Sequence, residues 1–252
     1  MAYIEGKLSR SESNCVPINN YAMQLKALAF KLDIKCKNQK QKEFLNQLKN
    51  KNNKICFGVG SPGTGKSFIS LLQALKELKD GNFETITIIA PTAQAGGADL
   101  SVGFLKGDFE QKVDPFCEAD KETINKILKL SGNIGYKEIT NLLMNNGMIK
   151  HEYVNFLLGK TIDNSIILCN EAQQYTSSNM RLILTRLGEN SKIVITGDYE
   201  QVNRKSIVNG KEECGLTHAM AVLKDLDEVS ITEFDNNDIV RNKLITKILE
   251  RW

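Results

Sequence analysis

The sequence predicts an α/β fold in which a parallel β-sheet is flanked by helices, with a helical insertion and a short N-terminal arm. Apolar runs typical of buried strands alternate with helical stretches along the chain. Polar clusters follow three of these runs, at Pro91-Thr92, Asn170-Glu171 and Gly197-Asp198. Because ligands of open parallel sheets bind at the carboxyl ends of the strands, these clusters predict the edge that carries a site.

Helical spacing of apolar residues follows a polar arm of about 20 residues and predicts helices over residues 21–32, 41–50 and 68–78. Continuous apolar runs predict strands over residues 55–59, 85–90, 165–169, 192–196 and 228–232. We therefore expect an N-terminal arm and helix over 1–36 and one domain over 37–252.

The stretch between residues 120 and 158 has helical periodicity and predicts an insertion over about 118–160. One apolar stripe contains Ile124, Ile127, Leu128 and Leu130. We favour a helical cover for the sheet over an oligomer or nucleic-acid surface.

Composition bounds the class of protein. Of 252 residues, 41% are hydrophobic and 25% charged, which is ordinary for a globular domain. The net charge of +3 neither requires nor excludes a nucleic-acid partner. The six cysteines form no CxxC or zinc spacing, and no apolar run would span a membrane. We expect a cytoplasmic protein with reduced cysteines and no membrane partner.

A phosphate-binding loop follows the first strand run. It reads Gly60-Ser61-Pro62-Gly63-Thr64-Gly65-Lys66-Ser67. The glycines allow the backbone amides to surround an anion, and the next helix directs its positive end toward it. Lys66 would contact the β- and γ-phosphates and Ser67 would bind Mg²⁺. The strand-loop-helix context favours a nucleoside triphosphate site over an accidental glycine-rich turn.

Two later strand runs end in further candidate residues. Asn170-Glu171 follows the run at 165–169, where a carboxylate for Mg²⁺ and one for the attacking water are expected. Asn170 keeps an acceptor oxygen but lacks the charge, so we predict weaker Mg²⁺ coupling and slower turnover, with Glu171 activating the water. Asp198 and Gln201 follow the next run. Asp198 is a candidate for Mg²⁺, and Gln201 for sensing the γ-phosphate.

These motifs, in this order, resemble the PhoH family of ATPases, which has a RecA-like core related to superfamily 1 helicases. Further matching segments extend the resemblance from about residue 38 to the C-terminus. They are Asn38-Gln39, residues 103–108, residues 112–115, residues 184–188, residues 215–216 and residues 238–241.

The resemblance implies ATP and Mg²⁺ as cofactors and assigns further roles. Gln39 is similar to the adenine-reading glutamine of helicases. Arg241, then Arg186, then Arg204 are candidates for an arginine finger supplied by a neighbouring subunit of a homo-oligomer, such as a hexameric ring. Each arginine could instead be an ordinary surface or salt-bridge residue.

Single-stranded RNA or DNA is the partner that the resemblance implies. Ala90-Pro91-Thr92 is similar to a strand-contacting motif of superfamily 1 helicases, although a proline there could simply end a strand. Thr92, Lys106 and Lys112 are the candidates for backbone contact. The leading interpretation is a nucleic-acid-dependent ATPase or helicase. The alternative is an ATP-binding switch or scaffold for another protein, with hydrolysis weakened by Asn170; a small-molecule kinase ranks last.

Overall fold

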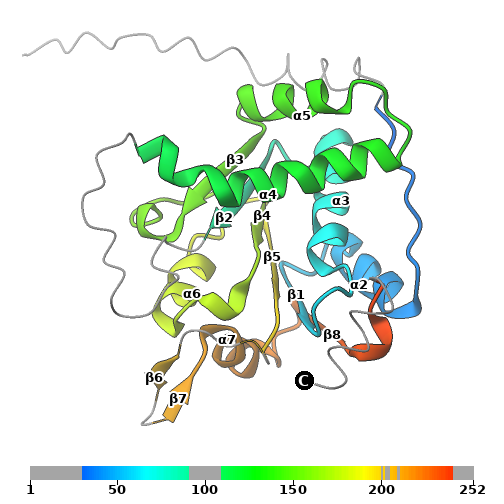
Figure 1. Ribbon diagram of the computed structural model, residues 1–252. Helices are drawn as coiled ribbons and strands as arrows, with labels where there is room; N and C mark the ends of the chain where they lie inside the picture. The colour runs from blue at the N-terminus through cyan, green and yellow to red at the C-terminus, as the bar shows by residue number, and fades with distance from the viewer. Residues whose placement is uncertain (1–29, 91–108, 200, 202–204, 209–210, 241–252) are drawn as a thin grey trace, which may run out of the picture.

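The computed structural model describes residues 30–90, 109–199, 201, 205–208 and 211–240. Within them a six-stranded parallel sheet is covered by helices on both faces (Figure 1). This arrangement confirms the predicted fold class.

The strand order of the sheet is β3-β2-β4-β5-β1-β8, and every pairing is parallel. The strands are β1 (Ile55–Gly60), β2 (Thr85–Ala90), β3 (Ile149–Tyr153), β4 (Ser165–Cys169), β5 (Lys192–Gly197) and β8 (Val229–Phe234). The four inner strands are buried almost from end to end, because helices exclude water from both faces.

One face of the sheet is covered by four helices that share a hydrophobic cluster. They are α2 (Gln39–Lys49), α3 (Lys66–Lys79), α4 (Phe109–Leu130) and α5 (Tyr136–Asn145). Phe44 of α2 packs in the space that Gly58 of β1 leaves, and its ring meets Phe234 edge to face with centroids 5.7 Å apart. Ile124, Ile127 and Leu128 of α4 are fully buried in the same cluster. The predicted stripe therefore covers the sheet, although Leu130 at its end is 60% exposed.

The opposite face is covered by α6 (Ser177–Leu184), α7 (Gly215–Leu223) and two short 3₁₀ helices, η1 (Val154–Phe156) and η2 (Ala172–Gln174). Tyr175 is fully buried there, and its hydroxyl donates to the carbonyl of Ile89 at 3.0 Å. Burial raises the pKa of Tyr175 well above its ordinary value, so the hydroxyl stays a donor. This bond fixes the loop after β4 against β2.

Two parts of the architecture differ from the sequence-based expectation. The insertion contains the edge strand β3, which was predicted to be helical. A short antiparallel hairpin, β6 (Ser206–Val208) and β7 (Lys211–Glu213), follows β5, and it was not predicted. The predicted helix over 21–32 falls mostly outside the described residues, and residues 30–32 are not helical.

The register brings the carboxyl ends of β1, β4 and β5 together. Val59 pairs with Gly197, and Cys169 pairs with Ile195. The phosphate-loop sequence, Asn170 and Asp198 therefore leave the same edge of the sheet. In the described part of the chain, no helix has the length and apolar character needed to cross a membrane.

Candidate functional site

The loop between β1 and α3 has the backbone shape of an anion site. Gly60, Gly63 and Gly65 have φ values of 114°, 81° and 90°, in the left-handed region that side chains disfavour. Gly65 precedes α3 and offers no side-chain cap to the helix. The first N–H groups of α3 are thus available to a phosphate, together with the positive end of the helix dipole.

Lys66 holds its ammonium group inside the loop. Its Nζ donates to the carbonyls of Gly60 (2.7 Å) and Ser61 (2.6 Å) and to Oγ1 of Thr64 (3.2 Å). The residue is only 8% exposed. A positive charge is thereby placed in the concavity of the loop, where the phosphates of a nucleotide would lie.

Residues far away in the sequence hold the loop from outside. Gln41 of α2 is buried; its Nε2 donates to the carbonyl of Thr64 at 2.8 Å, and its Oε1 accepts from the N–H of Lys37 at 2.7 Å. Val240 donates its N–H to the carbonyl of Gly63 at 3.1 Å. The loop is therefore preorganised by α2 on one side and by the segment after β8 on the other.

A chain of polar groups links α3 to the ends of β4 and β5. Ser67 Oγ lies 3.2 Å from Thr196 Oγ1, and Thr196 Oγ1 donates to Asn170 Oδ1 at 2.9 Å. Asp198, buried at the end of β5, lines the same cavity. Hydroxyl, amide and carboxylate oxygens are the ligands that Mg²⁺ prefers, so the donor set fits a nucleotide-bound Mg²⁺.

Glu171 is held at the cavity edge by a local network. Its backbone is left-handed, with a φ of 53°. Gln173 Nε2 donates to Glu171 Oε2 at 2.7 Å, and Gln173 Oε1 accepts from the N–H of Asp198 at 3.0 Å. One glutamine thus ties the carboxylate after β4 to the end of β5.

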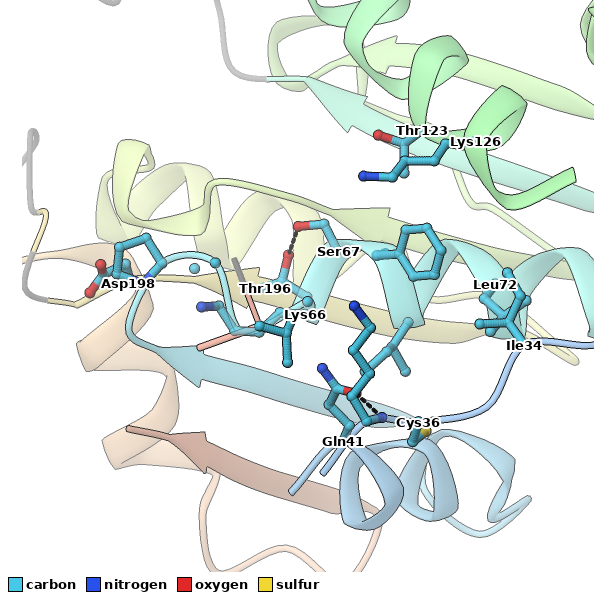
Figure 2. A pocket seen from close by; sticks show the side chains of 18 of the residues that line it. Ile34, Cys36, Gln41, Lys66, Ser67, Leu72, Thr123, Lys126, Thr196 and Asp198 are labelled. Carbon is cyan, nitrogen blue, oxygen red and sulfur yellow. Dashed lines mark hydrogen bonds between the residues drawn. The ribbon is translucent and has the colours of Figure 1, made fainter. Parts of the chain in front are cut away.

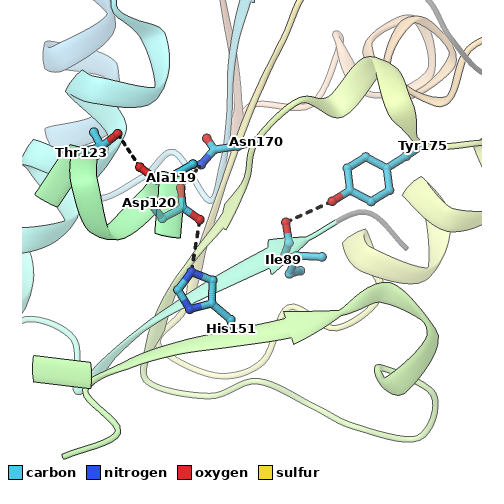
Figure 3. A network of polar contacts seen from close by, with 7 residues as sticks. All are labelled: Ile89, Ala119, Asp120, Thr123, His151, Asn170 and Tyr175. Atoms are coloured by element: carbon cyan, nitrogen blue, oxygen red, sulfur yellow. Dashed lines mark hydrogen bonds and ion pairs between the residues drawn. The ribbon is translucent and has the colours of Figure 1, made fainter. Parts of the chain in front are cut away.

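Asp120 of α4 extends the polar network away from the loop, as Figure 3 shows. Asn170 Nδ2 donates to Asp120 Oδ1 at 3.4 Å, and His151 Nε2 of β3 lies 3.2 Å from Asp120 Oδ2. Burial alone lowers the pKa of His151, but hydrogen bonds to Asp120 and Cys117 and their charges raise it from 6.5 to about 9. His151 is therefore protonated at neutral pH and pairs with Asp120.

The raised pKa of His151 makes stability depend on pH. Its folded-state pKa of about 9 lies above the unfolded value of 6.5, so the stabilisation is complete below pH 6.5 and is lost as pH rises through about 9. The interactions of protonated His151 with Asp120 and Cys117 are together expected to contribute up to about 3 kcal/mol to the free energy of unfolding. Urea denaturation from pH 6 to pH 10 should show a steeper decline for wild type than for His151→Gln. Parallel declines would contradict the assignment.

The cavity in front of the loop has a volume of about 740 Å³, within the range of sites that enclose a small ligand. Figure 2 shows Lys66, Ser67 and Thr196 along its floor, with Thr123 and Lys126 of α4 on one side and Gln41 on the other. The apolar part of its wall consists of Ile34, Phe68, Ile69, Leu72, Leu130 and Val240.

The structure gathers most of the predicted site residues. Those lining the cavity are Pro62, Gly63, Gly65, Lys66, Ser67, Glu171, Asp198 and Gln201. Gly60, Ser61 and Thr64 contact Lys66, and Asn170 accepts a hydrogen bond from Thr196, which also lines the cavity. Gln39 is exposed on the first turn of α2 and does not line the cavity. Arg186 donates to the carbonyls of Leu157, Lys160 and Leu182, which anchors a loop away from the cavity.

Thr92, Lys106, Arg204 and Arg241 lie outside the described residues, and Lys112 belongs to α4 without a described side chain. Sequence reasoning missed Gln41, Asp120 and Lys126. Gln41 lies two residues after Gln39, which was predicted to recognise adenine. The signal that could have identified Gln41 is its position beside Phe44 on the buried face of α2. Asp120 and Lys126 had no local signal, because their roles depend on where α4 crosses the sheet.

Comparisons with known proteins identify the family of this chain. The family model for PhoH-like proteins matches residues 33–252. The PhoH-like protein of Bacillus subtilis is 34% identical over 219 residues, which cover 87% of this chain and 64% of that protein. The PhoH-like protein of Mycobacterium tuberculosis is 30% identical over 200 residues (79% and 53%), and Protein PhoH of Escherichia coli is 27% identical over 219 residues (87% and 58%).

A parallel sheet with a glycine-rich loop between β1 and α3 defines an α/β protein of the P-loop class. Within that class, the chain belongs to the PhoH family. It spans between about half and two-thirds of the length of these curated relatives.

Proposed function

We propose that the chain binds and hydrolyses ATP in a reaction that single-stranded nucleic acid stimulates. The observation that carries the proposal is that Lys66, the start of α3, Glu171 and Asp198 all line one cavity. A cationic loop facing two carboxylates is what phosphoryl transfer to water requires, because the phosphates need positive charge and the attacking water needs a base.

Each residue then has a role. Lys66 and the first N–H groups of α3 bind the β- and γ-phosphates. Ser67, Asn170 and Asp198 would hold Mg²⁺, which would supply neutralising charge on the phosphates. Glu171 orients the attacking water and accepts its proton, with Gln173 fixing the carboxylate at 2.7 Å.

Coupling to nucleic acid is supported by the position of Ala90. It ends β2, which pairs with β4, so Ala90 lies at the edge of the sheet where Asn170 and Glu171 follow β4. Thr92, Lys106 and Lys112 are the proposed contacts to the nucleic-acid backbone, in RNA or DNA. Gln201 would couple the γ-phosphate to these nucleic-acid contacts. Arg241 of a neighbouring copy in a ring would complete the site.

Asn170 favours a second candidate, an ATP-binding switch that partners another protein. The neutral amide weakens the charge complementarity for Mg²⁺, so ATP would remain bound rather than be turned over. The two candidates differ in turnover and in its response to polynucleotide.

Steady-state ATP hydrolysis with Mg²⁺, alone and with single-stranded RNA or DNA, tests the proposal. The expected result is turnover that rises with one polynucleotide and that Lys66→Ala lowers by at least about 100-fold. Lys76→Ala is the matched control, since Lys76 lies near the C-terminal end of the same helix and does not line the cavity.

Bound ATP without turnover would favour the switch, and hydrolysis that persists in Lys66→Ala would contradict the assignment of the site. Turnover without a polynucleotide response would retain the ATPase and remove the nucleic-acid partner.

A further inference from the structure

Position 170 lacks the carboxylate that Ser67 and its Mg²⁺ would use. The carboxylate of Asp120, however, lies next to the side chain of Asn170. Asp120 Oδ1 is 3.4 Å from Asn170 Nδ2, although the two residues are 50 positions apart. Asp120 comes from α4, and Asn170 follows β4. The packing of the insertion against the sheet therefore brings an acidic group to the end of β4.

The direction of the hydrogen bonds along this network is determined by Asp120. A carboxylate only accepts hydrogen bonds, so the amide nitrogen of Asn170 must face it and the amide oxygen must face Thr196. Thr196 donates its single hydroxyl proton to Asn170 at 2.9 Å. The hydroxyl of Ser67, 3.2 Å away, must then donate to Thr196. The lone pairs of Ser67 are left for the cavity.

His151 orients the carboxylate. It lies 3.2 Å from Asp120 Oδ2, and both side chains are mostly buried, at 10% and 17% exposure. With one oxygen held by His151, the other is directed at Asn170, as Figure 3 shows. Burial strengthens such a chain, since each bond polarises the next.

We propose that Asp120 is the positioning residue of the nucleotide site: acting through Asn170 and Thr196, it turns the oxygen of Ser67 toward the Mg²⁺ that accompanies the nucleotide. This inference rests on the proposed function. It gives α4, and hence the insertion, a part in nucleotide binding. It also explains how an asparagine can take the place of an aspartate at position 170, because the carboxylate that only accepts hydrogen bonds is supplied by Asp120 of α4.

The test measures affinity for a fluorescent, non-hydrolysable ATP analogue with Mg²⁺ and with EDTA. Asp120→Asn is expected to lower the Mg²⁺-supported affinity about tenfold, because an amide at 120 allows the chain to reverse. The affinity in EDTA should not change. The exchange Asp120→Asn with Asn170→Asp is expected to restore affinity to within about twofold, since the carboxylate introduced at position 170 would accept from Thr196.

Two variants separate positioning from support of α4. His151→Gln removes the charge of the partner of Asp120 but keeps the carboxylate and offers it an amide donor, so its Mg²⁺-supported affinity should stay within about twofold of wild type. Thr196→Val interrupts the chain without touching the Asp120–His151 pair, and it should match Asp120→Asn without adding to it. Thermal melting identifies any variant that fails to fold, and Thr196→Val carries the test if Asp120→Asn does not fold.

The outcomes are distinct. If wild type binds the analogue but Asp120→Asn and Thr196→Val bind it equally well, the positioning role is wrong while the proposed function stands. If His151→Gln loses as much affinity as Asp120→Asn, Asp120 merely anchors α4. If wild type itself binds no nucleotide, the proposed function fails, and the positioning role fails with it.

Discussion

Glu171→Gln is expected to lower kcat for ATP hydrolysis by about 100-fold or more while leaving ATP affinity nearly unchanged. The amide keeps the size of the side chain but cannot accept a proton from water, and general bases commonly contribute this much. The left-handed backbone of Glu171 and the bond from Gln173 at 2.7 Å hold the carboxylate at the cavity edge. Steady-state turnover and nucleotide titration on the same preparation measure both quantities.

Glu152→Gln is the matched control for this experiment. Glu152 makes an ion pair with Lys160 at 2.8 Å and does not line the cavity. Exposed ion pairs contribute little, so this variant should keep its turnover within about twofold. If Glu171→Gln retained the activity of this control, another group would have to activate the water.

The inner strands could be predicted from the sequence because both of their faces are covered. Helices on each side make β1, β2, β4 and β5 continuous apolar runs, which stand out without knowledge of the partners. The edge strand β3 could not be found in this way, because Lys150, His151 and Glu152 interrupt its apolar pattern. Its position becomes evident only through its pairing with β2.

The same distinction applies to the site. Residues 60–67 are consecutive, so the phosphate-binding loop can be recognised from the sequence alone. Gln41 and Asp120 act through space from α2 and α4. The helical period of α2 marks Gln41, but no local pattern marks Asp120. Gln39 and Gln41 lie about 200° apart around a helix, so only one of them can face the loop. That one is Gln41, because it shares the buried side of α2 with Phe44.

Gly60→Ala is expected to reduce the free energy of unfolding by at least about 3 kcal/mol, from the combined cost of a left-handed backbone and overpacking. Gly60 has a φ of 114°, and an added Cβ would lie 1.9 Å from the carbonyl oxygen of Phe234. Because Phe234 is its register partner in β8, relief would require β1 and β8 to separate where the loop begins. A loss of this size is a large part of the stability of a typical domain.

Gly81→Ala provides the comparison, because it separates backbone strain from the clash. Gly81 has a φ of 74°, and an added Cβ would meet no atom within 4 Å. The backbone term alone is about 1 kcal/mol, so Gly81→Ala should shift the urea midpoint only slightly. Equal losses in the two variants would mean that β8 does not closely flank the loop. A larger loss in Gly60→Ala would show that the start of the phosphate loop depends on the β1–β8 register for its shape.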